Sequence, residues 1–295
     1  MKLYAPRYYL EFKCKADKCI HSCCKNWEID IDPSALKRYK KLKKGYGAEI
    51  SDSLSRDDTP HFKLKENGDC PHLDENWLCR IIREIGEEYL CDICREHPRF
   101  YNKTALGNEV GLGISCEEAC RIVLSSDCYA DTVSVNNAKS VTDKVDFRRD
   151  LYAVLSDRTV PYHERLDRLY SDYGVSPESL EGDAWRGVLS SLEFLNESHA
   201  EYFSEYTYSK LTPKELEAPL ERFLAYLVYR HCSPAKSHGE LIQSLGFCFF
   251  AERLLCCTAI KHKAYFDIFE LARIFSEEIE YSTDNLETLM LEFLI

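Results

Sequence analysis

Cysteine is the residue type whose number and position carry the clearest chemistry in this sequence. The chain has 15 cysteines, and eleven of them precede residue 130. The early set comprises Cys14, Cys19, Cys23, Cys24, Cys70, Cys79, Cys91, Cys94, Cys116, Cys120 and Cys128, and the later set comprises Cys232, Cys248, Cys256 and Cys257. Cysteines that act as small buried hydrophobes would be spread along the core, so this uneven distribution indicates a functional site.

The spacing of the early cysteines is typical of a thiolate metal site. The first cluster has the form C-x4-C-x3-C-C, and the second has the form C-x8-C followed by two more cysteines. Their members are Cys14, Cys19, Cys23, Cys24, Cys70, Cys79, Cys94 and Cys116. Thiolate ligands select zinc, copper(I) or iron-sulfur clusters, so zinc held by four thiolates and a [4Fe-4S] cluster are the leading candidates. Eight ligands can supply one cluster with spare thiols, or two sites.

Three details of the cysteine pattern limit these alternatives. Cys23 and Cys24 are adjacent, so in extended backbone their side chains would point to opposite faces, which favours two sites or one idle thiol. The odd number of cysteines fits free thiols in a reducing compartment better than a closed disulfide set. Cys91-x2-Cys94 is half of a zinc-knuckle or redox motif and is weak evidence alone.

Other signals of chemistry are sparse. Mixed ligation by a nearby histidine remains an alternative, and the candidates are His21, His61, His72 and His97. The C-x3-C-x2-C triplet of standard radical S-adenosylmethionine enzymes does not occur, and Gly111-x-Gly113 lacks the third glycine of a dinucleotide-binding loop. We interpret this glycine pair as a turn or strand feature.

The elements that carry these cysteines are expected to be short. Asp32-Pro33-Ser34 predicts the start of a helix over about 32–44, whose six cations at residues 37–44 most simply form a solvated face, with an acidic partner as the minor interpretation. Asn67-Gly68 predicts a small hairpin within residues 48–73. Helical spacing from Trp77 to Tyr89 places Cys79 inside a helix and leaves Cys91 and Cys94 at or past its end.

The remainder of the chain has a helical pattern. A helix is expected after Cys116, with this thiol near the helix N-terminus, where the amides and the dipole favour a thiolate. Further helices are expected at about 144–156, 162–173, 184–206, 213–231, 238–260, 265–281 and 284–294. The predicted fold is mainly α: a cysteine-rich metal-binding lobe with a small hairpin over 1–130, and a helical domain over 131–295.

Charge and hydropathy define the broad class. A formal net charge of −12 argues against sequence-independent binding of nucleic acid. The N-terminal residues lack the apolar segment of a secretory signal, and no run of about 18 apolar residues is evident, so no transmembrane segment is expected. These features indicate a cytoplasmic protein.

Read in order, four segments resemble the flagellin lysine-N-methylase family, within a broader group of cysteine-rich domains that chelate zinc or iron. The segments are FKCKADKCIHSCCKNW, CPHLDENWLCRI, CREHPRFYN and ISCEEACRIVL, which lie within roughly residues 10–125. The eight family cysteines fall on Cys14, Cys19, Cys23, Cys24, Cys70, Cys79, Cys94 and Cys116. Asn26 stands where the family commonly has glycine, a change that removes no thiol.

The resemblance implies a methyltransferase that transfers a methyl group from S-adenosylmethionine to lysines of flagellin and that requires an iron-sulfur cluster. The residues by themselves support the metal site only, because no S-adenosylmethionine loop and no catalytic residue can be assigned. Two other functions remain open: a non-catalytic interaction module stabilised by zinc or an iron-sulfur cluster, and a redox protein.

Overall fold

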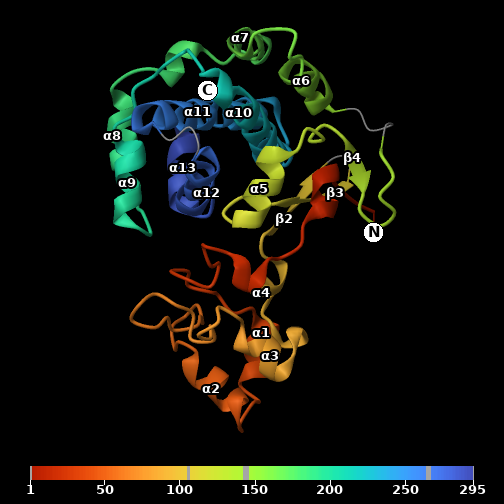
Figure 1. Cartoon of the computed structure of the whole chain (residues 1–295), viewed down its shortest axis with the longest axis vertical. Coiled ribbons are helices and arrows are strands. Elements are labelled where there is room, and N and C mark those ends of the chain that lie inside the picture. Colours follow the sequence, from red (N-terminus) through yellow and green to blue (C-terminus); the bar gives the residue numbers. More distant parts are fainter. Residues whose placement is uncertain (1, 105–106, 142–145, 264–266, 295) are drawn as a thin grey trace. The chain divides into compact units, whose positions relative to one another are not determined.

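The computed structural model describes residues 2–104, 107–141, 146–263 and 267–294. The chain divides into two compact units (Figure 1). The first, here the helical unit, consists of residues 1–12 and 99–295, and the second, the cysteine-rich unit, consists of residues 13–98. This division differs from the expected boundary near residue 130, because residues 99–130 belong to the helical unit.

A four-stranded sheet forms one part of the helical unit, in the order β2-β3-β1-β4. Its strands are β1 (Leu3–Pro6), β2 (Arg99–Thr104), β3 (Gly107–Leu112) and β4 (Thr132–Ser134). Strands β2 and β3 are antiparallel, and β1 runs parallel to β3 and antiparallel to β4. Gly111 pairs with Phe100, and a Cβ at Gly111 would lie 2.2 Å from the Phe100 ring. Gly111 is therefore a strand residue, and Gly113 follows the end of β3, which agrees with the expected turn or strand feature.

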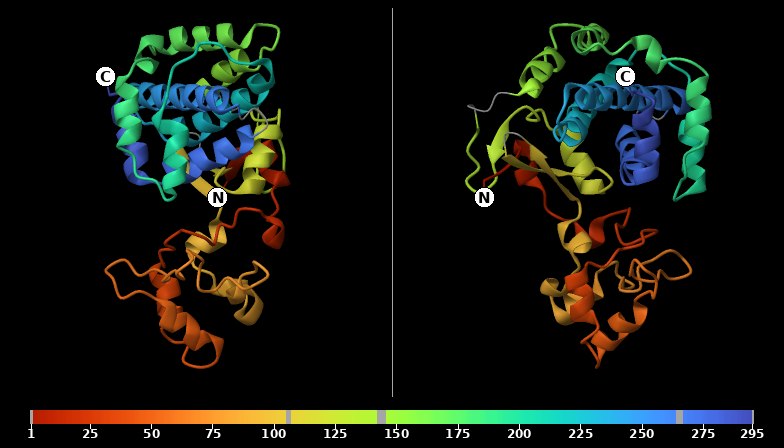
Figure 2. Two further views of the ribbon diagram at one scale, coloured as in Figure 1. Left: turned by 60° about the vertical axis from the view of Figure 1, so that its left-hand side comes forward. Right: turned by 180° about the vertical axis from the view of Figure 1, so that it is seen from behind.

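Helices make up the rest of this unit (Figure 2). The α-helices are α5 (Glu117–Ser125), α6 (Phe147–Leu155), α7 (Tyr162–Tyr173), α8 (Ala184–Ser190), α9 (Glu197–Ser204), α10 (Lys214–Leu227), α11 (His238–His262), α12 (Ile268–Phe275) and α13 (Thr283–Leu291). Short 3-10 turns cover Arg7–Glu11 and Pro177–Leu180, and π-helical turns extend α10 over Val228–Cys232 and α12 over Ser276–Glu280. The mainly helical fold is confirmed.

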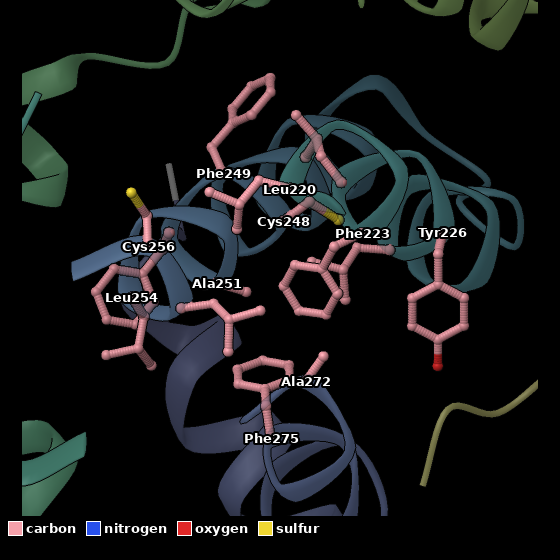
Figure 3. Close-up of a cluster of buried hydrophobic side chains, with 14 of the residues drawn as sticks. Leu220, Phe223, Tyr226, Cys248, Phe249, Ala251, Leu254, Cys256, Ala272 and Phe275 are labelled. Carbon is pink, nitrogen blue, oxygen red and sulfur yellow. The ribbon is translucent and has the colours of Figure 1, made fainter. Parts of the chain in front are cut away.

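The core of the helical unit lies where α10, α11 and α12 pack against one another (Figure 3). Phe223 of α10, Phe249 of α11 and Phe275 of α12 are fully buried there. Cys248 and Cys256 are also fully buried on α11, as small apolar side chains of the core. Burial of apolar surface on these three helices contributes to the driving force for folding this unit.

Helix α11 is long and apolar enough to cross a membrane by length and composition. Of its most apolar 18-residue window, 89% is buried inside the protein. A helix that is apolar on all sides is expected at the centre of a large core, where other elements cover every face. Helices α10 and α12 pack against α11 (Figure 3), and this burial explains why α11 is so apolar.

The cysteine-rich unit has short helices joined by irregular segments (Figure 1). Its elements are a 3-10 turn (Ala16–Lys18), α1 (Pro33–Tyr39), α2 (Tyr46–Ser53), α3 (Arg80–Ile85), a second 3-10 turn (Glu87–Tyr89) and α4 (Asp92–Glu96). Its own hydrophobic cluster contains Tyr39, Ile50, Phe62 and Ile81 together with two buried cysteines, Cys70 and Cys91. Because this core is small, cysteine ligation is well placed to influence its stability.

The hairpin expected within residues 48–73 is present only as a short antiparallel pairing, and the pairing does not flank Asn67-Gly68. Leu54 forms an antiparallel bridge with Phe62. Gly68 adopts a positive φ of 82°, as a turn requires, but Asp69 beside it forms a bridge with Lys25. A longer antiparallel pairing joins β2 and β3 in the helical unit.

Several expected helices differ from the structure at their ends. The helix expected over 184–206 is two helices, because Asn196 caps α9 and interrupts the run. The first residues of two other expected helices, 144–145 and 265–266, lie outside the described residues. The helix over 162–173 and the helix start after Cys116 are confirmed.

Candidate functional site

Six cysteines of the cysteine-rich unit form one interacting group of thiols, here the thiol cluster. Its members are Cys23, Cys24, Cys70, Cys79, Cys91 and Cys94. Cys24 interacts electrostatically with Cys70 and Cys79, and Cys94 interacts with Cys24 and Cys70. The backbone amide of Cys70 donates to the Cys24 carbonyl at 2.8 Å, which joins the two sequence clusters directly.

Three local structures bring the thiol cluster together. Cys23 and Cys24 lie in a turn, Cys79 is the N-cap of α3, and Cys91 is the N-cap of α4. Cys94 lies within α4. The expected single helix with Cys79 inside it is therefore wrong, because Gly86, at a φ of 105°, ends α3 and the chain starts again at α4.

The turn at Cys23 and Cys24 also corrects the expectation that these thiols point to opposite faces. The two side chains hydrogen-bond to each other, and this bond lowers the pKa of the Cys23 thiol to about 7 and raises the pKa of the Cys24 thiol. The backbone is turned here instead of extended, so neighbouring side chains meet. Both thiols are therefore available to one site.

Cys91 and Cys94 form a second pair of this kind. Their mutual hydrogen bond lowers the pKa of Cys91 and raises the pKa of Cys94. Cys91 is fully buried and lies in the hydrophobic cluster of the unit. It is absent from the eight cysteines that the resemblance indicates, and its C-x2-C spacing to Cys94 was the signal that could have identified it.

Backbone amides near several cysteines favour the thiolate form. The amide of Ala16 donates to Cys14 Sγ at 3.4 Å. Burial raises the pKa of Cys70 to about 11, and the amide of His72 opposes this rise. At Cys79, burial again raises the pKa of the thiol while the amides of Ile81 and Ile82 oppose it. Donors to sulfur stabilise negative charge, and metal binding requires deprotonated cysteines.

His72, one of the histidines considered for mixed ligation, has both ring nitrogens engaged. Nδ1 lies 2.9 Å from the Tyr46 hydroxyl and Nε2 lies 2.9 Å from Ser53 Oγ. Burial lowers the pKa of His72 to about 4, so the ring is neutral. We therefore assign His72 to the core of the unit. His21, His61 and His97 lie in the same unit and stay candidates.

The other three predicted ligands are Cys14, Cys19 and Cys116. Cys14 and Cys19 belong to the cysteine-rich unit, where Cys14 is exposed and Cys19 is partly exposed. Cys116 belongs to the helical unit, where it is the N-cap of α5 and interacts with Cys120. The structure thus places seven of the eight predicted ligands in one unit, and it adds Cys91 to them.

The donors of this unit are thiols, a ligand type that soft metals prefer. All fifteen cysteines are free thiols, so none of the cluster is consumed by a disulfide. In tetrahedral zinc sites Zn–S bonds of about 2.3 Å put the sulfurs roughly 3.8 Å apart, whereas each cysteine of a [4Fe-4S] cluster binds a different iron. Over the described residues, the set of three donor atoms that lie within 4.8 Å of one another is at His199, Glu277 and Glu278, so the sulfurs of the thiol cluster are not gathered at that spacing.

That second group of donors is already satisfied within the helical unit. Glu278 accepts hydrogen bonds from the amides of Leu195, at 2.6 Å, and Asn196, at 3.3 Å, and contacts His199 Nδ1 at 2.6 Å. Glu277 pairs with Arg273 at 2.9 Å. These contacts connect the start of α9 to the end of α12, so we assign the group a structural role.

Known proteins similar to this chain come from bacteria and carry flagellar or methylase names. The chain is 29% identical over 153 residues to the flagellar biosynthetic protein FliU of Salmonella muenchen. This match covers 49% of this chain and 88% of the relative. The chain is 30% identical over 129 residues to the lysine-N-methylases of Salmonella typhimurium and Salmonella choleraesuis. Over these residues the chain is similar to lysine-N-methylases.

The match to the lysine-N-methylase family is partial. It covers 41% of this chain and 32% of each lysine-N-methylase, so the chain spans about a third of the length of those relatives. No protein-family model matches the chain, and no solved structure gives a significant match. The activity, substrate and cofactors of the lysine-N-methylases are therefore only proposed for this chain.

Asp32 connects α1 to the helix that carries two cysteines of the thiol cluster, as its N-cap and within it. Its carboxylate caps α1 by accepting from the amides of Ser34, at 3.1 Å, and Ala35, at 2.9 Å. It also accepts a hydrogen bond of 2.9 Å from the amide of Asp92, the first residue of the helix that carries Cys94. One side chain thus fixes the starts of two helices.

Replacement of Asp32 by alanine is expected to lower the free energy of unfolding by about 1–2 kcal/mol. Burial raises the pKa of Asp32, but the Ser34 hydroxyl and the amides of Ala35 and Asp92 lower it to about 2. Because the folded-state pKa is depressed, this contribution is present above about pH 4 and is lost as pH falls toward 2. Denaturant unfolding of the purified protein at pH 7 and across this range measures both effects.

The exposed Asp30, replaced by alanine, is the matched control, and it should leave stability unchanged within about 0.5 kcal/mol. Equal losses in the two variants would contradict the capping role of Asp32.

Proposed function

We propose that this protein is an S-adenosylmethionine-dependent protein-lysine N-methyltransferase that acts on flagellin in the cytoplasm. The observation that carries the proposal is its similarity to lysine-N-methylases over 129 residues. The name of another relative, the flagellar biosynthetic protein FliU, supports flagellin as the substrate. A substrate that is later exported would be accessible to a cytoplasmic enzyme before export.

We further propose that the cysteine-rich unit holds a [4Fe-4S] cluster, with zinc as the alternative metal. The support is the thiol cluster with its free cysteines and amide donors. The candidate ligands are Cys23, Cys24, Cys70, Cys79, Cys91 and Cys94 in the cluster, with Cys14, Cys19 and Cys116 as further candidates. A bound cluster would order a unit whose apolar core is small.

Methyl transfer to lysine imposes two requirements on the protein. The ε-amine must lose its proton, because only the neutral amine has a lone pair that can attack the methyl carbon. As the new C–N bond forms, the bond from that carbon to the sulfonium breaks, and S-adenosylhomocysteine leaves. The protein must therefore desolvate the amine and accept its proton, roles that tyrosines and carboxylates can perform.

Incubation of the metallated protein with S-adenosylmethionine and unmethylated flagellin from the same source is expected to add about 14 Da per methyl group to exposed lysines. Intact-protein mass spectrometry gives the increment, and peptide mapping identifies the modified lysines. A sample depleted of metal should add none if the metal orders the enzyme.

The matched control is the Cys232→Ser variant, in which a buried cysteine of the helical unit is changed and the thiol cluster is intact. It should methylate at the rate of the unmodified protein. A fully metallated sample that neither binds S-adenosylmethionine nor changes the mass of flagellin would refute the enzymatic proposal.

The small core of the cysteine-rich unit favours a second candidate, a metal-stabilised module without catalysis. Its helices are five to eight residues long, shorter than helices that are stable in isolation. A metal that serves only to fold this unit would account for the thiol cluster equally well, and a redox role would use the same ligands. Binding of S-adenosylmethionine to the metallated protein separates the methyltransferase from both.

A further inference from the structure

The helical unit contains a cavity of about 350 Å³ between the segment that follows α9 and the C-terminal turns of α11. One wall is formed by Glu205, Tyr206 and Tyr208, and the other includes Thr258 and Lys261. Tyr202 of α9 also lines the cavity. Its walls are mainly apolar and aromatic, with few charged groups.

Three of the residues that line the cavity are tyrosines, a side chain whose ring face can attract a cation. Tyr206 is held in place, because its hydroxyl donates to the Leu180 carbonyl at 2.9 Å and its ring packs edge-on against Phe250. Tyr202 is held by an edge-on contact with the His262 ring. Faces of tyrosine rings attract ammonium groups, and rings that are fixed beforehand lose little freedom when a ligand binds.

The position of the cavity adds a second attraction for positive charge. Helix α11 has 25 residues and ends at His262, directly beside the cavity. The C-terminal end of a helix carries partial negative charge, from carbonyls without intrahelical partners. An ammonium in the cavity would therefore lie near this end of the longest described helix.

One carboxylate and one lysine already form an ion pair at the cavity. Lys261 Nζ contacts a carboxylate oxygen of Glu205 and lies 3.3 Å from the Glu205 carbonyl. The Glu205 side chain is 67% exposed and the Lys261 side chain 39% exposed, so this pair is weak and can exchange partners. His262 and Arg186 are the other cations that act on Glu205.

We propose that this cavity receives the lysine side chain of the protein substrate, with its ammonium taking the place of Lys261 beside Glu205. The volume lies at the lower end of the roughly 300–1,000 Å³ typical of ligand sites, which suits one long side chain. The methylenes would lie along the tyrosine rings. The inference rests on the proposed lysine methyltransferase function, and it names where the substrate side chain binds.

Binding of short peptides to the full-length protein tests this assignment without any methyl transfer. The probes are one peptide with a central lysine and the same peptide with norleucine, which retains the methylenes and lacks the ammonium. Calorimetry or ligand-observed NMR should show the norleucine peptide binding about tenfold more weakly. Equal affinities for the two peptides would overturn the proposal.

Two substitutions should change lysine-peptide affinity in opposite directions. Glu205→Gln removes the carboxylate and should weaken binding about tenfold, whereas Lys261→Met removes the internal competitor and should strengthen it about threefold. Glu164→Gln and Lys214→Met are matched controls, because these exposed residues lie outside the cavity lining. The controls should leave the affinity unchanged.

The outcomes separate this proposal from the proposed function. If the protein methylates flagellin but Glu205→Gln and Lys261→Met bind the peptide like the unmodified protein, the cavity assignment is wrong and the function stands. If the peptide binds with the expected opposite changes but no methyl group is transferred, the cavity assignment stands and the methyltransferase proposal fails. Thermal unfolding of each variant shows whether a change in binding reflects a loss of folded protein.

Discussion

Protein purified without oxygen is expected to be brown and to contain iron with acid-labile sulfide. The physical reason is the thiol cluster, in which interacting cysteines lie in a unit with a small apolar core and no disulfide. Metal and sulfide analysis together with a visible absorption spectrum tests this. Stoichiometric zinc without sulfide would contradict the iron-sulfur assignment and leave the zinc alternative.

Serine substitutions within the thiol cluster should then reduce metal content at least about tenfold, or abolish soluble expression, because a neutral hydroxyl is a poor ligand for soft metals. The variants are Cys24→Ser, Cys70→Ser, Cys79→Ser, Cys91→Ser and Cys94→Ser. Cys14→Ser, Cys19→Ser and Cys116→Ser test the ligands that the resemblance indicates outside the cluster.

Cys232→Ser and Cys248→Ser are the controls, because these two buried cysteines lie in the helical unit. They should retain metal at the level of the unmodified protein. Full retention in Cys91→Ser with loss in Cys94→Ser would favour the eight cysteines of the family pattern over the set that the structure brings together. Retention in every variant would show that the thiol cluster is not the metal site.

The sequence could point to a cysteine-rich region because thiol chemistry is tied to residue type, and metal binding there stays a prediction. The sequence could not reveal how Cys23 and Cys24 are oriented, since that depends on a turn whose partner strand is near Asp69, more than forty residues away. The predicted set of metal ligands did not include Cys91. Its local C-x2-C motif is weak evidence alone, and its burial beside Cys70 is a tertiary property.

Long helices of the helical unit were predictable because their apolar residues recur with the helical period, as in α7. The sheet was not predicted, since β1 is four residues long and pairs with β3, about a hundred residues later in the chain. The buried carboxylates of this unit also have no local sequence signal. A glutamate in an amphipathic helix looks solvent-exposed until the arginine from another helix is seen beside it.

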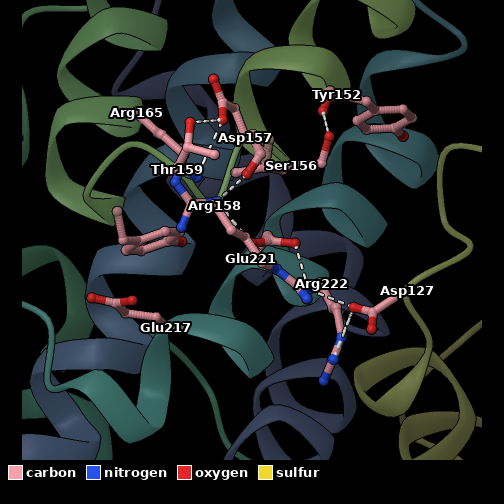
Figure 4. A network of polar contacts seen from close by, with 12 residues as sticks. Asp127, Tyr152, Ser156, Asp157, Arg158, Thr159, Arg165, Glu217, Glu221 and Arg222 are labelled. Carbon is pink, nitrogen blue, oxygen red and sulfur yellow. Dashed lines mark hydrogen bonds and ion pairs between the residues drawn. The ribbon is translucent and has the colours of Figure 1, made fainter.

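Glu221 of α10 is the clearest case, and the network around it is drawn in Figure 4. Its side chain is 1% exposed and accepts from Arg165 Nη1 at 2.8 Å, Arg158 Nη2 at 3.0 Å and the Tyr129 hydroxyl at 2.9 Å. Arg165 is itself buried, with its side chain 3% exposed. The carboxylate therefore neutralises a guanidinium that has little access to water.

Glu221→Ala is expected to lower the free energy of unfolding by about 3–5 kcal/mol, because it leaves the Arg165 charge buried without its carboxylate. For a domain of this size the melting temperature should fall by roughly 6–20 °C. Glu217→Ala, one turn earlier on α10, is the matched control. Glu217 pairs at 2.8 Å with Lys214, whose side chain is 90% exposed, so this change should cost no more than about 1 kcal/mol.

Differential scanning calorimetry of the two variants and the unmodified protein measures both effects under the same conditions. A further variant, Glu221→Gln, retains the shape and one acceptor oxygen but removes the charge. It should fall between the other two if charge neutralisation of Arg165 and hydrogen bonding both contribute. A loss in Glu221→Ala as small as that in Glu217→Ala would mean that Arg165 finds water or another acceptor, such as the Leu155 carbonyl to which it already donates, once the carboxylate is gone.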